Sequence, residues 1–289
     1  MKKLTRRQFL GTSAIGIGSA VVASQFPVSL KASTAARAVN YPVGFQTWTL
    51  RDKLDKDFAG TLKMMAGMGY QCVEMCSPPG YKDLGFGSLV GMKGKEMRKI
   101  INDAGLAFES THYGFDELKN NLDERIEFAA ESGQKQMILS SFGLPEGATM
   151  SDWMKAADEL NKIGARTKKA GIQMGYHNHN MEFAKIDGKL IYDALMNQLD
   201  PENVKMQFQV AVISIGYKAA DYFKKYPGRF ISSHLADWSP SENKNVVIGK
   251  GVVDWNEFFA AAKTGGVRNI FVEMEPETFK DSAAYLHSL

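Results

Sequence analysis

The chain has 289 residues, of which 44% are hydrophobic and 23% charged, values typical of a globular protein with ample core. Its formal net charge of +3 depends on the first 38 residues, which carry six basic side chains and no acidic one. The remaining chain has 29 of the 35 basic residues against all 32 acidic ones, a net charge of −3. This balance argues against nucleic acid as a partner, because a phosphate-binding surface needs clustered positive charge.

The first 38 residues have the pattern of a twin-arginine export signal. Arg6 and Arg7 precede a moderately apolar stretch, rich in Gly and Ala, that runs to about Ala23. Cleavage sites are offered by Ala36–Ala38 and, earlier, by Val21–Ala23. The apolar run is too short and too rich in small residues for a stable membrane anchor. We therefore expect the export machinery as a partner, removal of the signal, and a periplasmic mature protein.

Past the signal, apolar runs typical of strands alternate with amphipathic runs typical of helices. We predict strands near 43–48, 70–76, 106–112, 136–142, 172–179, 204–210, 229–235 and 269–275. We predict helices near 57–67, 94–104, 116–132, 151–170, 190–197, 218–225, 254–264 and 279–288. Eight alternating units in about 250 residues indicate a single (β/α)8 TIM barrel over residues 39–289. A doubly wound open sheet is the alternative, but no Gly-rich nucleotide loop follows the first strand.

The carboxyl ends of the barrel strands are where an active site forms in this architecture. Four of the five histidines fall on predicted strand ends, whereas His287 lies in the last predicted helix and is expected at the surface. The candidate residues at these ends are Gln46, Trp48, Glu74, His112, His177, His179, Gln207, Gln209, His234, Asp237, Glu273 and Glu275. Imidazoles and carboxylates on neighbouring strands suit a divalent metal such as Mn, Zn, Co or Mg.

Two short stretches concentrate these groups. His177 and His179 are two residues apart, so in an extended strand they point to the same face. The alternative is a pair of hydrogen-bonded structural histidines. Glu273 and Glu275 also share a predicted strand face, and buried paired acids are costly unless a cation or a proton neutralises them. Both stretches therefore favour a polar site at the barrel mouth.

Several motifs together carry a family resemblance. They are Gly-Phe-Gln-Thr-Trp at 44–48, Tyr-His-Asn-His-x-x-Glu-Phe at 176–183, His-Leu-x-Asp at 234–237, Gly-x-Gly-x-x-Asp-Trp at 249–255 and Phe-Val-Glu-x-Glu at 271–275. In this order and spacing the chain resembles the sugar phosphate isomerase/epimerase family of xylose isomerase-like TIM barrels. The resemblance covers essentially all of residues 42–289.

The resemblance implies a divalent metal held by a carboxylate from the fifth strand, an Asp from the sixth, a His from the seventh and a Glu from the eighth. Gln209 stands where similar proteins carry the Asp, and an amide brings no charge and binds a metal more weakly. On the fifth strand the match stays open between His177, His179 and Glu182. The metal ligands that we expect are His179, Glu182, Gln209, His234 and Glu273.

The implied chemistry is proton abstraction beside a carbonyl, with a metal-stabilised enediolate. Glu182, Glu273 and His177 are the expected catalytic residues, and Gln46, Trp48, Glu74, His112, Asp237 and Glu275 the expected substrate-binding ones. The expected activity is isomerisation or epimerisation of a sugar, with two alternatives: a lyase or hydratase on an oxidised sugar or glycoside, and a non-catalytic carbohydrate-binding barrel. A periplasmic location and the lack of an Arg/Lys clamp favour a non-phosphorylated substrate. The sequence does not decide the oligomeric state, and a homo-oligomer is compatible with it.

Overall fold

The computed structural model describes residues 41–289. The predicted twin-arginine signal and its cleavage sites lie outside the described residues, so export and the domain boundary at residue 38 stay predictions. Within 41–289, no helix combines the length and the apolar character that crossing a membrane requires.

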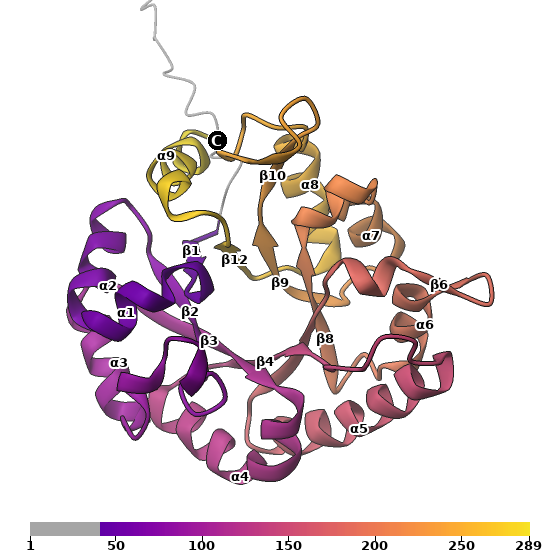
Figure 1. The fold of residues 1–289 in the computed structure, drawn as a ribbon, viewed down its shortest axis with the longest axis horizontal. Helices are drawn as coiled ribbons and strands as arrows, with labels where there is room; N and C mark the ends of the chain where they lie inside the picture. Colours follow the sequence, from indigo (N-terminus) through magenta and orange to yellow (C-terminus); the bar gives the residue numbers. More distant parts are fainter. Residues whose placement is uncertain (1–40) are drawn as a thin grey trace, which may run out of the picture. The chain divides into compact units, whose positions relative to one another are not determined.

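Eight parallel strands close into a barrel in the order β1-β12-β9-β8-β5-β4-β3-β2, which confirms the predicted fold (Figure 1). Each observed strand lies within one of the predicted strand ranges or overlaps most of it. The barrel strands are β1 (Val43–Gln46), β2 (Cys72–Cys76), β3 (Ala107–Gly114), β4 (Gln136–Ser141), β5 (Gln173–His177), β8 (Val204–Gln209), β9 (Phe230–Leu235) and β12 (Asn269–Val272).

Helices surround the barrel on its outside (Figure 1). All eight predicted helices are present, and the short α1 is an additional one. The helices are α1 (Arg51–Lys56), α2 (Phe58–Gly67), α3 (Gly94–Asp103), α4 (Phe115–Ser132), α5 (Met150–Lys169), α6 (Ile191–Gln198), α7 (Ala219–Lys225), α8 (Trp255–Gly265) and α9 (Phe279–Ser288).

Local sequence signals set the ends of these helices. Thr149 caps α5 by accepting a hydrogen bond from the backbone N–H of Asp152, whose carboxylate accepts in return from the N–H of Thr149. Such a cap contributes about 1 kcal/mol to stability. Gly266 ends α8 in the left-handed region at φ +87°, which a side chain would strain. These two helices thus begin or end at residues that the sequence itself specifies.

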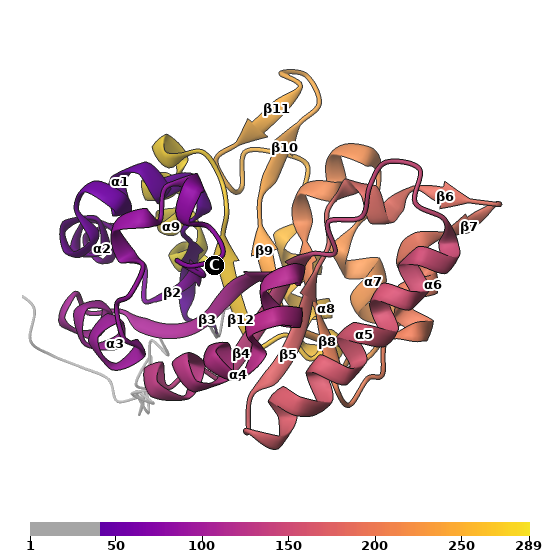
Figure 2. The ribbon, with the colours of Figure 1, turned by 60° about the horizontal axis from the view of Figure 1, so that its bottom comes forward.

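Short elements extend the loops that follow the strands. Two hairpins are formed by β6 (Lys185–Ile186) with β7 (Lys189–Leu190) and by β10 (Asp237–Ser239) with β11 (Lys244–Val246). The β10–β11 hairpin projects beyond one end of the barrel (Figure 2). The 3-10 helices are η1 (Trp48–Leu50), η2 (Lys82–Leu84), η3 (Gly87–Leu89), η4 (Asn180–Phe183), η5 (Val210–Ile215) and η6 (Pro276–Thr278).

Candidate active site

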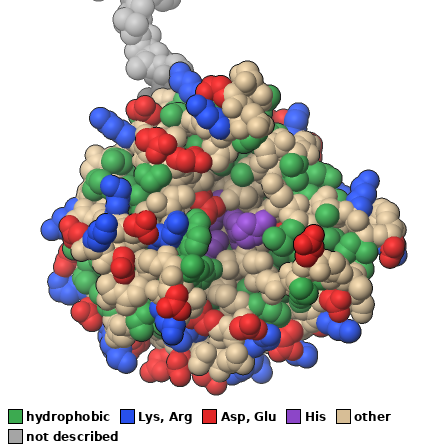
Figure 3. Space-filling view, viewed as in Figure 1, with side chains coloured by type: hydrophobic (Ala, Val, Ile, Leu, Met, Phe, Trp, Pro, Cys, Tyr) green, Lys and Arg blue, Asp and Glu red, His purple; other side chains and the backbone are tan. Residues whose placement is uncertain are grey.

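Three buried histidines from different strands meet inside the barrel mouth. His112 lies on β3, His177 ends β5, and His234 lies on β9. The ring centroids of His112 and His177 are 5.0 Å apart, those of His112 and His234 5.0 Å, and those of His177 and His234 4.4 Å. We call these residues the histidine triad; histidine side chains gather in the central hollow of the molecule (Figure 3). One ring nitrogen of each lies within 4.8 Å of the others, so the triad could bind a metal ion.

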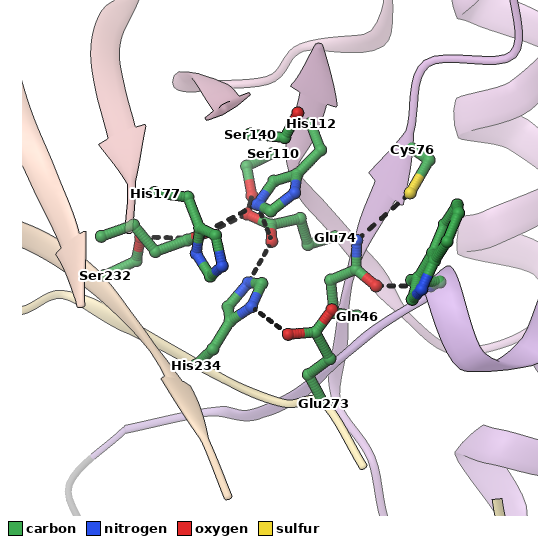
Figure 4. A network of polar contacts seen from close by, with 12 residues as sticks. Gln46, Glu74, Cys76, Ser110, His112, Ser140, His177, Ser232, His234 and Glu273 are labelled. Atoms are coloured by element: carbon green, nitrogen blue, oxygen red, sulfur yellow. Dashed lines mark hydrogen bonds and ion pairs between the residues drawn. The ribbon is translucent and has the colours of Figure 1, made fainter. Parts of the chain in front are cut away.

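Glu74, on β2, lies against the triad with its side chain fully buried (Figure 4). Its Oε1 contacts His234 Nε2 at 2.5 Å and His112 Nε2 at 3.0 Å. Its Oε2 accepts hydrogen bonds from the Ser110 hydroxyl and the Gln207 amide. Burial raises the pKa of Glu74, but the charges and hydrogen bonds of the two histidines outweigh it and hold this pKa well below the usual range. The carboxylate is therefore charged.

His234 lies between two carboxylates. Its Nδ1 is 3.0 Å from Glu273 Oε2, opposite the contact of its Nε2 with Glu74. Burial lowers the pKa of His234, yet the two carboxylates together raise it to about 9. Burial likewise raises the pKa of Glu273, and the imidazolium of His234 lowers it to a net value below the usual one. Gln209 Nε2 donates to the same Glu273 oxygen at 2.7 Å, which leaves Glu273 Oε1 without a hydrogen-bond partner among residues 41–289.

The amide of Gln207 fixes the rings of two triad members. Its Nε2 donates to Glu74 Oε2 and to the Ser232 hydroxyl, both at 2.9 Å. A carboxylate only accepts, so this contact sets which side of the amide faces Glu74. Gln207 Oε1 therefore faces His112 Nε2 at 2.7 Å and His177 Nδ1 at 2.9 Å. Burial and the neighbouring histidines hold the pKa of His177 well below its usual value, so His177 is neutral.

A cavity of about 240 Å³ opens above this cluster. Its wall includes an aromatic corner, in which Trp48 and Tyr81 meet edge to face with centroids 5.9 Å apart. His179 lines the cavity from an exposed position, with its ring 4.9 Å from that of His177. No Lys or Arg belongs to the lining, which consists of Gln46, Trp48, Cys76, Tyr81, His112, Ser140, Ser141, His177, His179 and Glu273.

Three predicted site residues lie elsewhere. Glu182 is buried in η4, where one oxygen accepts from the Tyr176 hydroxyl at 2.5 Å and the other from the His179 N–H at 2.7 Å. Asp237 is also buried and does not line the cavity. Glu275 is exposed and accepts from Asn245 Nδ2 at 3.3 Å. The expectation that Glu273 and Glu275 form a buried pair is corrected, because β12 ends at Val272 and the strand alternation ends with it.

Asp237 organises a loop by accepting hydrogen bonds from five donors. Its Oδ2 accepts from the N–H groups of Gly249 and Gly251 and from the Trp255 indole, at 2.9, 3.2 and 3.0 Å. Its Oδ1 accepts from the N–H groups of Val253 and Trp238, at 3.1 and 3.0 Å. With both oxygens occupied in this way, Asp237 holds the loop and is not among the residues that line the cavity.

Several cavity residues were not predicted from the sequence as site residues. Tyr81 comes from the loop after β2 and donates to Ser140 Oγ at 2.7 Å, and Ser141 lies beside it at the end of β4. The buried Cys76 thiol accepts from Gln46 Nε2 at 3.2 Å and lines the cavity. Gln207, named among the candidates at the strand ends without an assigned role, lies below the cavity and shares the strand face of Gln209.

Comparisons with known proteins agree with this architecture. The family model described as xylose isomerase-like TIM barrel matches residues 62–289. The chain is similar to the crystal structure of a sugar phosphate isomerase/epimerase from Parabacteroides distasonis, at 27% identity and TM-score 0.71, covering 91% of this chain and 98% of that one. A solved structure of the IOLI protein with a zinc atom is 15% identical, with TM-score 0.60 over 86% of this chain and 94% of that one, a likeness of fold alone.

The chain is also similar to a curated relative, an inosose dehydratase of Clostridium perfringens. The two are 23% identical over 188 residues, which are 58% of this chain and 63% of the relative. The match thus spans less than two thirds of the relative's length.

Proposed function

The chain belongs to the xylose isomerase-like TIM barrel family, and on this premise we propose that it is an enzyme that removes a proton beside the carbonyl of a non-phosphorylated sugar. The observation that carries the proposal is the cavity itself, which presents a carboxylate and imidazoles to a ligand but no cationic side chain. A phosphorylated substrate would need Arg or Lys there to neutralise it.

Glu273 acts as the base. Its Oε2 accepts from His234 and Gln209, while Oε1 has no hydrogen-bond partner within the described residues and the side chain lines the cavity. Its lowered pKa keeps it ionised at neutral pH, ready to accept a proton. Gln209, which replaces an acid in the family pattern, thus positions the base through its amide N–H.

His179 acts as the partner acid, because it is the remaining titratable side chain of the wall that is exposed to a ligand. Burial lowers the pKa of His179 below its usual value, so the ring must take up a proton before it acts as the acid. We assign this role to His179 rather than to Glu182, whose two oxygens are both occupied outside the cavity. Trp48 and Tyr81 provide an aromatic corner for the apolar face of a sugar ring. Gln46, Ser140 and Ser141 offer hydrogen bonds to its hydroxyl groups.

The triad and Glu74 fit a divalent metal, which when bound would polarise the substrate carbonyl. The residues of the chain perform the proton transfers. Glu273 Oε1 takes the proton from the carbon beside the carbonyl, and the C–H electron pair forms the enediolate. A proton returned to carbon from His179 completes epimerisation or isomerisation.

β-Elimination is a second candidate outcome at the same site, favoured by the similarity to an inosose dehydratase. Here the electron pair from the C–H bond forms a C=C bond and expels a hydroxyl group from the next carbon. The leaving hydroxyl takes a proton from His179 and departs as water. The two outcomes share the first step and differ in the fate of the enediolate.

The test is solvent deuterium exchange into a panel of free aldoses, ketoses and 3-keto sugars, together with their phosphorylated forms. We expect exchange into a non-phosphorylated member, and Glu273→Gln should lower its rate about 10²–10⁴-fold. The matched control is Glu275→Gln, two residues away and exposed, which should leave the rate unchanged. Exchange confined to sugar phosphates, or undiminished in Glu273→Gln, would contradict the proposal. A product lighter by one water identifies the elimination.

A further inference from the structure

Nitrogen and oxygen atoms of four side chains crowd together below the cavity. His112 Nε2 lies 2.7 Å from Gln207 Oε1 and 3.0 Å from Glu74 Oε1, which in turn lies 2.5 Å from His234 Nε2. A ring nitrogen carries at most one proton, so His112 Nε2 cannot make a full hydrogen bond to both oxygens. Glu74 Oε1 therefore has ring nitrogens of two histidines within 3.0 Å, and a cation can replace the protons that lie between these three atoms.

The outer contacts of two triad rings also match a metal site. Histidines that bind metals usually donate their second ring N–H to a carboxylate or a carbonyl oxygen. His234 Nδ1 faces the Glu273 carboxylate at 3.0 Å, and His177 Nδ1 faces the Gln207 carbonyl oxygen at 2.9 Å. These contacts orient both rings through Nδ1 and leave Nε2 of each ring as the nitrogen available to a metal ion. For His177 Nε2, the described part of the chain supplies no hydrogen-bond partner.

The composition of the cluster distinguishes between metal ions. Ligand atoms bound tetrahedrally at about 2.0–2.2 Å lie roughly 3.3–3.6 Å apart. His112 Nε2 is 3.0 Å from Glu74 Oε1, and one ring nitrogen of each triad member lies within 4.8 Å of the others, so small side-chain shifts bring these atoms to such separations. Imidazole nitrogen suits zinc and other borderline ions, whereas magnesium prefers oxygen ligands in an octahedron. Three imidazoles and one carboxylate therefore favour zinc.

We propose that Glu74 and the histidine triad form a zinc-selective site that lies deeper in the barrel than the ligands predicted from the family pattern. Of those predicted ligands it keeps only His234, while His179, Glu182, Gln209 and Glu273 stay outside it. Glu273 is thereby left free to act on the substrate. This inference rests on the metal of the proposed function. Metal binding is measured without any substrate turnover, so the zinc site and the proposed enzyme activity can each fail independently of the other.

The first experiment uses the full barrel, residues 39–289, freed of metal by a chelator. Calorimetric titration with Zn²⁺ should show one tight site, and Mg²⁺ at millimolar concentration should not displace the ion. X-ray absorption of the zinc-loaded protein should show three imidazole ligands. A wild-type protein that binds no Zn²⁺, that prefers Mg²⁺, or whose zinc has a single imidazole would overturn the proposal, with no variant needed.

The second experiment separates the deep site from a site at the mouth. His112→Gln and His177→Gln should each weaken Zn²⁺ binding by at least the roughly 10–100-fold that loss of an outer partner costs. The matched controls, His179→Gln and Gln209→Ala, alter predicted ligands that stand outside the deep site and should keep wild-type affinity and an unchanged absorption spectrum with Co²⁺. Loss of binding in these controls, with retention in His112→Gln, would place the ion at the mouth and overturn the proposal.

Discussion

Glu74 and Glu182 are both fully buried carboxylates at the mouth of the same barrel, yet the chain treats them in opposite ways. Glu74 contacts two imidazoles and stays charged, since they hold its pKa well below the usual range. Glu182 contacts one hydroxyl and one backbone N–H, and burial raises its pKa from 4.5 to about 7. Burial alone therefore does not decide whether an acid is ionised. The charge of the groups that face it does.

Among variants that test this difference between the two carboxylates, Glu74→Gln should lower the stability of the fold most. The substitution leaves the His234 imidazolium with Glu273 as its remaining carboxylate, and breaking a buried pair costs about 3–5 kcal/mol. Because the folded pKa of Glu74 is depressed, its contribution is present above about pH 4.5 and is lost as the pH falls. Urea unfolding at pH 7 measures the loss, and Glu275→Gln is the exposed control. Equal stability of the two variants would contradict this account.

The next largest effect is expected from Glu182→Gln, and it depends on pH. The folded pKa of about 7 lies above the usual 4.5, so wild-type stability falls as the pH rises between these values, by about 3 kcal/mol from this group. Glutamine does not ionise. Its amide oxygen can accept from the His179 N–H, and its NH2 group can donate to the Tyr176 hydroxyl oxygen. The variant should therefore gain stability relative to wild type between pH 5 and pH 8. Parallel stability profiles for the two proteins over this window would rule out the raised pKa.

The smallest effects come from two hydroxyl groups, one beside each carboxylate. Ser110→Ala removes a donor to the charged Glu74 and should cost about 1.5–3 kcal/mol at pH 7. Tyr176→Phe removes the donor to Glu182, and at pH 5, where Glu182 is protonated, should cost about 1 kcal/mol. Thermal unfolding of both variants at both pH values compares them. The comparison fails if Tyr176→Phe costs as much at pH 5 as at pH 8.

The fold was predictable because its signals are local. Barrel strands such as Asn269–Val272 contain short apolar runs, and helices such as Met150–Lys169 combine an amphipathic pattern with a recognisable cap. The α1 helix and the β10–β11 hairpin were missed for the converse reason. Both are short, and the hairpin strand Lys244–Val246 is polar enough to read as a loop.

The site was predictable only as far as the strands extend. His112 and His234 lie within strands, so their position at the mouth followed from the architecture. Glu182 lies past the end of β5, where the chain turns into η4 and directs the carboxylate back to Tyr176. Tyr81 reaches the cavity from a loop, where no periodicity predicts which side chains face inward. The role of Gln207 follows from contacts to four other strands, which no single segment encodes.

The five hydrogen bonds to Asp237 have a consequence for how the barrel could diversify. They join Asp237, at the start of the β10–β11 hairpin, to Gly249 and Gly251, which follow it. The two ends of the hairpin are thus held together at its base. A longer or different hairpin could be inserted without moving β9 or the residues that it carries into the site. The same closure makes two positions interdependent, because a Cβ at residue 251 would stand 2.2 Å from Asp237 Oδ1. The hairpin can thus change while its attachment point stays, provided that Asp237 and Gly251 are kept as a pair.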